Sequence, residues 1–212
     1  MYQPPHFREP DLAAQHELIR AHPLGLLIST GTEGALADPI PFLLYADEGP
    51  LGTLRCHVSR ANPQWLALQG QPQALVVFLG GESYITPSWY ATKAEHGKVV
   101  PTWNYAVVQA RGPALVIEDA AWLYANVSAL TQQNERTRPA PWAVSDAPDS
   151  FIAAQLRGIV GIEIPIVGLE GKFKASQNRP IEDRKGVADG LNAAGDAASL
   201  AMRDMVRQFG GL

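Results

Sequence analysis

Aromatic and hydrogen-bonding side chains alternate in two blocks of the sequence between positions 84 and 105. The members of these blocks that could contact a ligand are Ser88, Trp89, Thr102, Trp103 and Asn104. Aromatic rings supply contact area to a flat ligand, while hydroxyl and amide groups fix its orientation. The blocks therefore favour a site for a flat heteroaromatic ligand. The alternative is that both tryptophans are core residues at the end of a β-barrel.

A second concentration of chemistry lies between positions 171 and 185, where five of the residues are Lys or Arg. Lys174 is followed by the amide side chains of Gln177 and Asn178, just before a predicted helix. Cationic and neutral donors of this kind suit a phosphate group or a ring carbonyl. The alternative is the solvated end of a β-hairpin.

A third candidate contains Arg60 and Asn62, where a predicted strand ends beside the start of a predicted helix. An arginine next to the free N–H groups of a helix N-terminus forms a natural anion-binding site. Asn62 is also suited to cap that helix, because its side-chain oxygen can accept from the first N–H groups.

Several familiar kinds of site are excluded by the sequence. Cys56 is the only cysteine, so neither an internal disulfide nor a thiolate zinc site can form within one chain, and we expect this cysteine to be buried and structural. The five histidines show no tight ligand spacing, so no metal site is expected. The sequence also lacks a P-loop, a G-x-G-x-x-G motif and a G-x-S-x-G motif.

The composition is that of a globular chain with a sizeable core. Of the 212 residues, 46% are hydrophobic and 18% are charged, and the formal net charge is −4. This charge does not favour non-specific binding of nucleic acid, so any DNA contact needs a local basic face. Neither a long apolar run nor a basic start followed by an apolar stretch is present, so we expect a cytoplasmic protein without a membrane segment.

Hydrophobic patterning and turn residues predict the elements that position these side chains. Strands are predicted over 24–30, 37–45, 51–59, 74–80, 105–117 and 158–166. Helices are predicted over 11–21, 63–69, 118–133, 179–191 and 197–209, with a loop over 134–149. Short strands with interspersed helices favour a mainly β fold with peripheral helices (α+β), a small closed or split β-barrel, over a doubly wound sheet.

The predicted helix over 197–209 carries one apolar stripe, formed by Met202, Met205, Val206 and Phe209. An amphipathic helix buries its apolar stripe against another surface. This stripe is expected to pack on the core of its own chain or on a second subunit.

Five blocks occur in a characteristic order: HPLG at 22–25, HVSRANPQW at 57–65, YITPSWY at 84–90, VPTWNY at 100–105 and KFKASQN at 172–178. Together they resemble the FMN-binding negative transcriptional regulator family, the PaiB type. The likeness covers residues 1–191 and implies an FMN-binding split β-barrel similar to pyridoxamine-phosphate oxidase-like flavoproteins. Residues 192–212 are then expected to form a C-terminal helix on the barrel or on the dimer partner.

The resemblance implies a homodimer that binds FMN near the subunit interface and represses transcription. The cofactor-binding residues expected from matching roles are Arg60, Asn62, Ser88, Trp89, Thr102, Trp103, Asn104, Lys174, Gln177 and Asn178. Arg60 and Lys174 are expected at the FMN phosphate, because a dianion requires charge-assisted donors. Ser88 and Thr102 are expected to assist at the phosphate or at the ribityl chain. Trp89 or Trp103 is expected to cover a face or edge of the isoalloxazine. The amides of Asn104, Gln177 and Asn178 are expected to contact its carbonyl and ring nitrogens.

Three functions remain open at this point. The first is a flavin-binding regulator of transcription, which contacts DNA or a protein. The second is a flavin-dependent oxidoreductase, linked to NAD(P)H, without direct DNA binding. The third is an interaction barrel without a cofactor. The sequence shows no acid or base for catalysis and no convincing helix-turn-helix, although basic residues between 179 and 207 leave a basic face on the dimer open.

Overall fold

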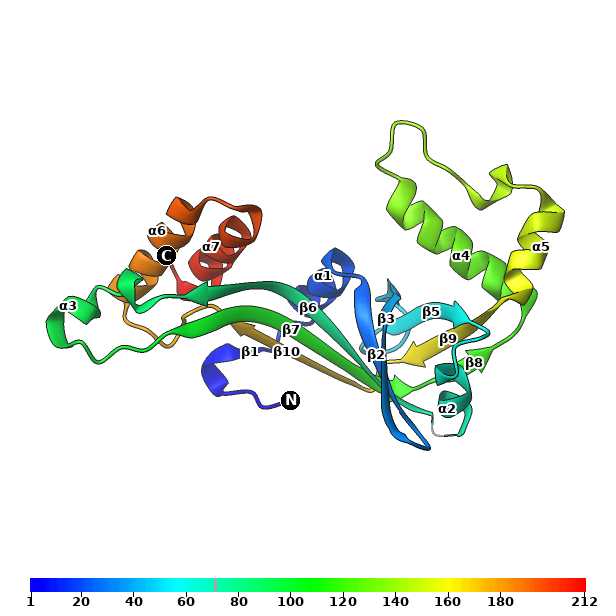
Figure 1. Ribbon diagram of the computed structural model, residues 1–212, viewed down its shortest axis with the longest axis horizontal. Helices are drawn as coiled ribbons and strands as arrows, with labels where there is room; N and C mark the ends of the chain where they lie inside the picture. Colours follow the sequence, from blue (N-terminus) through cyan, green and yellow to red (C-terminus); the bar gives the residue numbers. More distant parts are fainter. Residues whose placement is uncertain (71) are drawn as a thin grey trace. The chain divides into compact units, whose positions relative to one another are not determined.

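The computed structural model describes residues 1–70 and 72–212, and these form two compact units (Figure 1). Unit 1 comprises Met1–Gln15, Leu79–Val108 and Glu170–Leu212, and unit 2 comprises His16–Phe78 and Gln109–Leu169. Helix α1 (Leu12–Ala21) and strands β6 (Gln73–Ile85), β7 (Thr102–Pro113) and β10 (Gly168–Lys174) have residues in both units. The predicted mixture of antiparallel strands and peripheral helices is confirmed.

Unit 1 contains strands in the order β1-β10-β7-β6. Its remaining elements are η1 (Pro5–Phe7), β1 (Arg8–Glu9), η2 (Pro87–Trp89), α3 (Thr92–His96), β10 (Gly168–Lys174), α6 (Ile181–Ala194) and α7 (Ala197–Gly210). Strand β10 was not predicted, because closely spaced glycines such as Gly168 and Gly171 are typical of turns. Gly171 instead pairs with Glu9 of β1, and a Cβ at this position would lie 2.9 Å from the side chain of Gln15. The absence of a side chain allows this close approach.

The core of unit 1 lies between α6 and α7, which run side by side in Figure 1. Met202 and Val206 of α7 are buried in one cluster with Val187 and Leu191 of α6. The other two residues of the predicted stripe are partly buried against the same cluster. The apolar stripe of α7 therefore packs within its own unit, whereas the domain division after residue 191 stays a prediction.

Unit 2 contains the strand order β6-β2-β3 and a second sheet with the order β4-β5-β9-β8. Its elements are β2 (Leu24–Gly31), β3 (Gly34–Pro41), β4 (Leu43–Tyr45), β5 (Thr53–Ser59), α2 (Gln64–Gly70), β8 (Leu115–Ile117), α4 (Ala120–Glu135), η3 (Val144–Asp146), α5 (Asp149–Arg157) and β9 (Ile159–Pro165). The expected turn between β2 and β3 is present, with Gly34 at a φ of 119°. Helix α4 begins as predicted, because Asp119 accepts a hydrogen bond from the N–H of Trp122.

Two predicted strands are broken, and the helices α3 and α5 were not predicted. The strand over 37–45 breaks at Phe42, whose side chain is buried and whose N–H donates to the carbonyl of Pro23 at 2.8 Å. The strand over 105–117 breaks at Ala114, which separates β7 from β8. Helix α5 begins at Asp149, the last residue of the predicted loop. The sequence signal for its start was an acidic residue in the first turn, Asp149, directly after Pro148. Tertiary pairing set these boundaries, and hydrophobic patterning alone did not show them.

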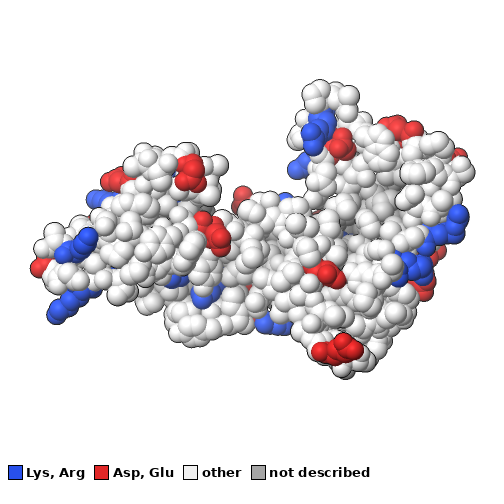
Figure 2. Space-filling view, viewed as in Figure 1, with Lys and Arg blue, Asp and Glu red and all other residues white. Residues whose placement is uncertain are grey.

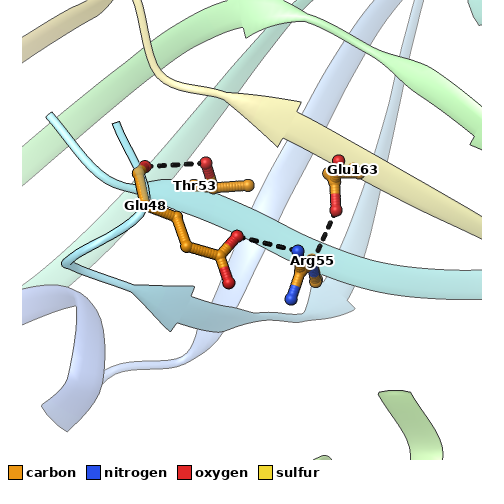
Figure 3. Close-up of polar contacts among 4 residues, drawn as sticks. All are labelled: Glu48, Thr53, Arg55 and Glu163. Atoms are coloured by element: carbon orange, nitrogen blue, oxygen red, sulfur yellow. Dashed lines mark hydrogen bonds and ion pairs between the residues drawn. The ribbon is translucent and has the colours of Figure 1, made fainter. Parts of the chain in front are cut away.

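Charged side chains fasten the second sheet of unit 2 across its strands (Figure 3). Arg55 of β5 lies opposite Glu163 of β9, and their side chains form an ion pair at 2.6 Å. Arg55 also pairs with Glu48 at 2.7 Å and lies over the ring of Tyr45 at 4.2 Å. The Thr53 hydroxyl donates to the Glu48 carbonyl at 2.9 Å. These contacts hold β4, β5, β9 and the segment before β5 together. The carboxylates of Glu48 and Glu163 therefore have a structural role in this sheet.

Candidate functional site

Four of the predicted cofactor residues converge on one small cavity in unit 1. This cavity, called here the unit 1 cavity, has a volume of about 100 Å³. It is lined by Tyr90, Val100, Pro101, Thr102, Asn104, Lys174, Ser176, Asn178 and Arg179. The predicted members Thr102 and Asn104 come from β7, and Lys174 and Asn178 come from the end of β10 and the turn after it. Adjacent strands thus assemble residues that are about 70 positions apart in the chain.

Lys174 brings an uncompensated charge to the unit 1 cavity. Its ammonium group donates to the Thr102 hydroxyl and, at 2.6 Å, to the carbonyl of Trp103. Burial and the neighbouring charges of Lys172 and Arg179 lower the pKa of Lys174. Both acceptors are neutral, so the position favours an added negative charge.

Asn104 is fully buried and has one end of its amide unpartnered. Its Nδ2 donates to the hydroxyl of Ser176 at 2.9 Å, whereas Oδ1 has no hydrogen-bond partner among the described residues. Ser176 is itself buried and has a φ of 64°, a left-handed conformation that is uncommon outside glycine. A buried polar atom without a partner costs free energy, and a bound ligand that pairs with it removes that cost.

Tyr90 and Arg179 line the same cavity, although sequence analysis did not select them. The guanidinium carbon of Arg179 lies 4.5 Å from the centre of the Tyr90 ring, and the Tyr90 side chain is buried. Burial raises the pKa of Tyr90, whereas the charge of Arg179 and its side-chain hydrogen bond oppose that shift. Tyr90 is the last residue of the block at 84–90, and Arg179 directly follows the block at 172–178, so their positions in the sequence could have indicated them.

Trp89 and Trp103 have different surroundings. Trp89 is partly buried and lies against α6, where a Cβ on Gly190 would come within 3.0 Å of its ring. Trp103 is 52% exposed, and its ring meets that of Tyr84 edge to face at 5.9 Å between centroids. Trp103 is therefore the tryptophan with an open surface, while Trp89 packs on its own unit.

Ser88 and Gln177 do not line the unit 1 cavity. The Ser88 hydroxyl is exposed and accepts from Lys93 at 3.3 Å. The Gln177 amide closes the turn after β10, because Oε1 accepts from the N–H of Ala175 at 2.7 Å and Nε2 donates to the carbonyl of Phe173 at 2.6 Å. Gln177 thus shapes the turn that places the neighbouring cavity residues.

Arg60 and Asn62 belong to unit 2, and both side chains have partners there. Arg60 donates to the Glu118 carboxylate at 2.6 Å and to the carbonyl of Arg157 at 3.0 Å. Asn62 caps α2 as predicted, since its Oδ1 accepts from the N–H of Gln64 at 2.8 Å, and its Nδ2 donates to Asp38 at 2.8 Å. The predicted anion-binding group at this strand end is engaged with the chain's own carboxylates.

Other reactive groups are placed in structural settings. Cys56 is buried, as expected, and burial raises the pKa of its thiol. In the part of the chain that the structure describes, no group of three or more His, Cys, Asp or Glu side chains could hold a metal ion. Among the same residues, no helix is both long and apolar enough to cross a membrane.

The chain belongs to the family described as "Putative FMN-binding domain", whose model matches residues 1–167. The expected resemblance to FMN-binding proteins is thereby confirmed. Because the family is described as FMN-binding, the cofactor of this chain is FMN.

Relatives extend over most of the chain. An uncharacterised protein of Emericella nidulans is 37% identical, covering 95% of this chain and 94% of its own. The protease synthase and sporulation protein PAI 2 of Bacillus subtilis is 27% identical, covering 90% of this chain and 89% of its own. Among solved structures, the FAD and heme binding protein from Mycobacterium smegmatis matches with a TM-score of 0.59 at 17% identity, covering 79% of this chain and 73% of that one. The last likeness concerns the fold alone.

The residues of unit 1 fit a flavin nucleotide chemically. The unit 1 cavity offers the Lys174 ammonium group, which forms no ion pair among the described residues, and the unpartnered Oδ1 of Asn104. A phosphate or a ring carbonyl accepts from such a cation, and a ring N–H or a hydroxyl donates to such an oxygen. The cavity itself, at about 100 Å³, is far smaller than the 300–1,000 Å³ typical of whole-ligand pockets, so its volume suits a group of a few atoms.

Proposed function

We propose that this protein is an FMN-binding homodimer that regulates transcription, in the manner that the PaiB-type resemblance implies. The observation that carries the proposal is the family match together with the uncompensated polar cavity in unit 1. The sporulation-related name of the Bacillus subtilis relative supports the regulatory part.

The proposed cofactor site uses the predicted residues of unit 1. Lys174 binds the FMN phosphate, Thr102 assists, and the exposed ring of Trp103 covers the isoalloxazine in preference to Trp89. Asn104 and Asn178 complete the polar lining of the unit 1 cavity, and Gln177 shapes the turn that places Asn178. Arg60 and Asn62 have their own partners in unit 2 and are not assigned to this site. Bound FMN supplies any redox chemistry, while the protein sets its access and electrostatics.

The site is tested by titrating FMN into the purified protein and into the variant Lys174→Met. We expect flavin fluorescence to be quenched by the wild type and the affinity to fall at least tenfold in the variant, because a charge-assisted bond is lost. Circular dichroism and size-exclusion chromatography with light scattering control for folding and for the dimer. Equal affinity of both proteins would refute the assigned phosphate contacts.

A second candidate function is a flavin-dependent oxidoreductase without direct DNA binding. Two basic side chains of the C-terminal helices, Arg203 and Arg184, favour it, because they already bind groups of the chain itself and are less available to a DNA phosphate. Arg203 donates to Asp204 at 2.8 Å and to Asn192 at 2.7 Å, and Arg184 donates to the carbonyl of Gly210. On the face that Figure 2 shows, acidic and basic side chains are interspersed, without a continuous basic field.

One spectrum separates the two functions. The FMN-loaded protein is mixed anaerobically with NADH or NADPH while the flavin absorption is followed. Rapid bleaching supports the oxidoreductase, and a flavin that stays oxidised supports the regulator. For the regulator, a mobility shift must also show sequence preference and survive a modest rise in salt, since non-specific binding is lost with salt.

A further inference from the structure

Arg179 reaches the unit 1 cavity because the turn after β10 folds back on itself. Gln177 closes this turn on the backbone, and the N–H of Arg179 donates to the carbonyl of Ser176 at 2.9 Å. The left-handed conformation of Ser176 reverses the chain direction at this point. As a result Lys174 and Arg179, five positions apart, line one cavity.

Neither cation has a counter-ion. Among the described residues, no carboxylate forms an ion pair with Lys174 or Arg179, and the cavity lining contains no acidic side chain. The buried carboxylate of Asp183 on α6 is engaged elsewhere, since it accepts from the N–H and the hydroxyl of Thr92, both at 2.9 Å. Burial and like charges lower the pKa of Lys174, which is the expected consequence of a missing anion.

The neutral groups of the cavity complete a set of donors. Asn104 is 0% exposed, and one end of its amide is paired only with the Ser176 hydroxyl. Because a hydroxyl both donates and accepts, the amide can turn and present its NH₂ to a ligand. The hydroxyl of Tyr90, a buried residue of the same lining, can donate as well.

The size of the cavity limits the ligand to a group of a few atoms. Its volume of about 100 Å³ is roughly three times the ~30 Å³ that one water molecule occupies in the liquid. A phosphate-type group with its several acceptor oxygens matches this volume and this donor set, whereas a tricyclic ring does not.

We infer that Lys174 and Arg179, with Asn104 and Tyr90, form an oxyanion site for a phosphate-type group. The inference deepens and rests in part on the proposed function, because one source of the group is the phosphate of FMN. The other source is a free phosphate-type anion that binds beside the flavin. Arg179 and Tyr90 are thereby added to the ligand-binding residues.

The test compares FMN with riboflavin, which lacks the phosphate, in the wild type, in Arg179→Gln and in Tyr90→Phe. Arg207→Gln, a change of the same charge at an exposed position on α7 in the same unit, is the matched control. If the group is the FMN phosphate, Arg179→Gln lowers FMN affinity roughly ten- to a hundredfold, the effect of one charge-assisted hydrogen bond, and leaves riboflavin affinity unchanged. Tyr90→Phe has a smaller effect in the same direction.

The free anion is tested with inorganic phosphate, by calorimetry on the FMN-loaded protein and by thermal stabilisation of the flavin-free protein. If the group is a free anion, Arg179→Gln keeps its FMN affinity and loses phosphate binding, and Arg207→Gln keeps both. The thermal-stabilisation measurement with inorganic phosphate still tests the oxyanion site if the wild type binds no FMN. A wild type that binds no FMN would refute the proposed function separately.

Two results overturn the inference. In the first, Arg179→Gln matches Arg207→Gln in both FMN affinity and phosphate binding. In the second, FMN and riboflavin affinities fall equally, which would place Arg179 at the ring. Arg179→Lys and circular dichroism distinguish loss of the charge from loss of the fold.

Discussion

The packing of Trp89 on two glycines of α6 leads to a prediction with a defined magnitude. A Cβ on Gly190 would come within 3.0 Å of three atoms of the Trp89 ring, and a Cβ on Gly186 would come within 3.0 Å of the Trp89 carbonyl oxygen. Ordinary Cβ contacts begin at 3.4 Å. Both alanine substitutions therefore force a shift, but the first is opposed by a side chain and the second by the backbone.

The expected free energies follow from two opposing effects. Overpacking lowers the free energy of unfolding by about 1–3 kcal/mol, and replacing a helical glycine by alanine raises it by about 1 kcal/mol. Because backbone yields less than a ring, we expect Gly186→Ala to destabilise by about 2 kcal/mol and Gly190→Ala by about 1 kcal/mol. In a Trp89→Ala background, Gly190→Ala should instead stabilise by about 1 kcal/mol, whereas Gly186→Ala stays destabilising.

The assay is urea unfolding followed by circular dichroism for each single and double variant. Gly70→Ala at the end of α2 is the matched control, because among the described residues no heavy atom beyond its chain neighbours and its own helix backbone lies within 4 Å of the added Cβ; it should be neutral or slightly stabilising. The reasoning is refuted if Gly190→Ala has the same effect with and without the Trp89 ring. That outcome would free Trp89 to contact the flavin.

Two further predictions concern titrating groups. Burial raises the pKa of the Cys56 thiol, so we expect it to resist iodoacetamide at pH 8 in the native protein and to react once urea unfolds it; rapid native labelling would contradict the buried position. Burial lowers the pKa of His57 below its ordinary 6.5, so the stability contributed by the neutral ring is present above pH 6.5 and is lost as the pH falls through the folded-state pKa. The unfolding free energy should therefore decline between pH 7 and pH 5 less steeply in His57→Gln than in the wild type, and identical slopes would exclude this role for His57.

The sequence by itself determined the class of fold, most helices and the family. Helix α4 with its Asp119 cap and the apolar stripe of α7 were predictable because capping and amphipathic spacing are local properties. The ordered blocks also indicated the cofactor, since family membership depends on residue types in order and needs no coordinates. Strand β10 was missed, because its glycines mark turns in isolation, and only pairing with β1 explains them.

Only the tertiary structure decided which polar residues act together. Sequence proximity suggested Ser88, Trp89 and Gln177 as ligand contacts, yet the first is exposed, the second packs on α6 and the third closes its own turn. Arg179 and Tyr90 joined the cavity through a left-handed turn and strand pairing, which no local pattern records. The physical reason is that charge compensation and burial depend on neighbours distant in the chain, so a lysine without a counter-ion can be recognised only after folding.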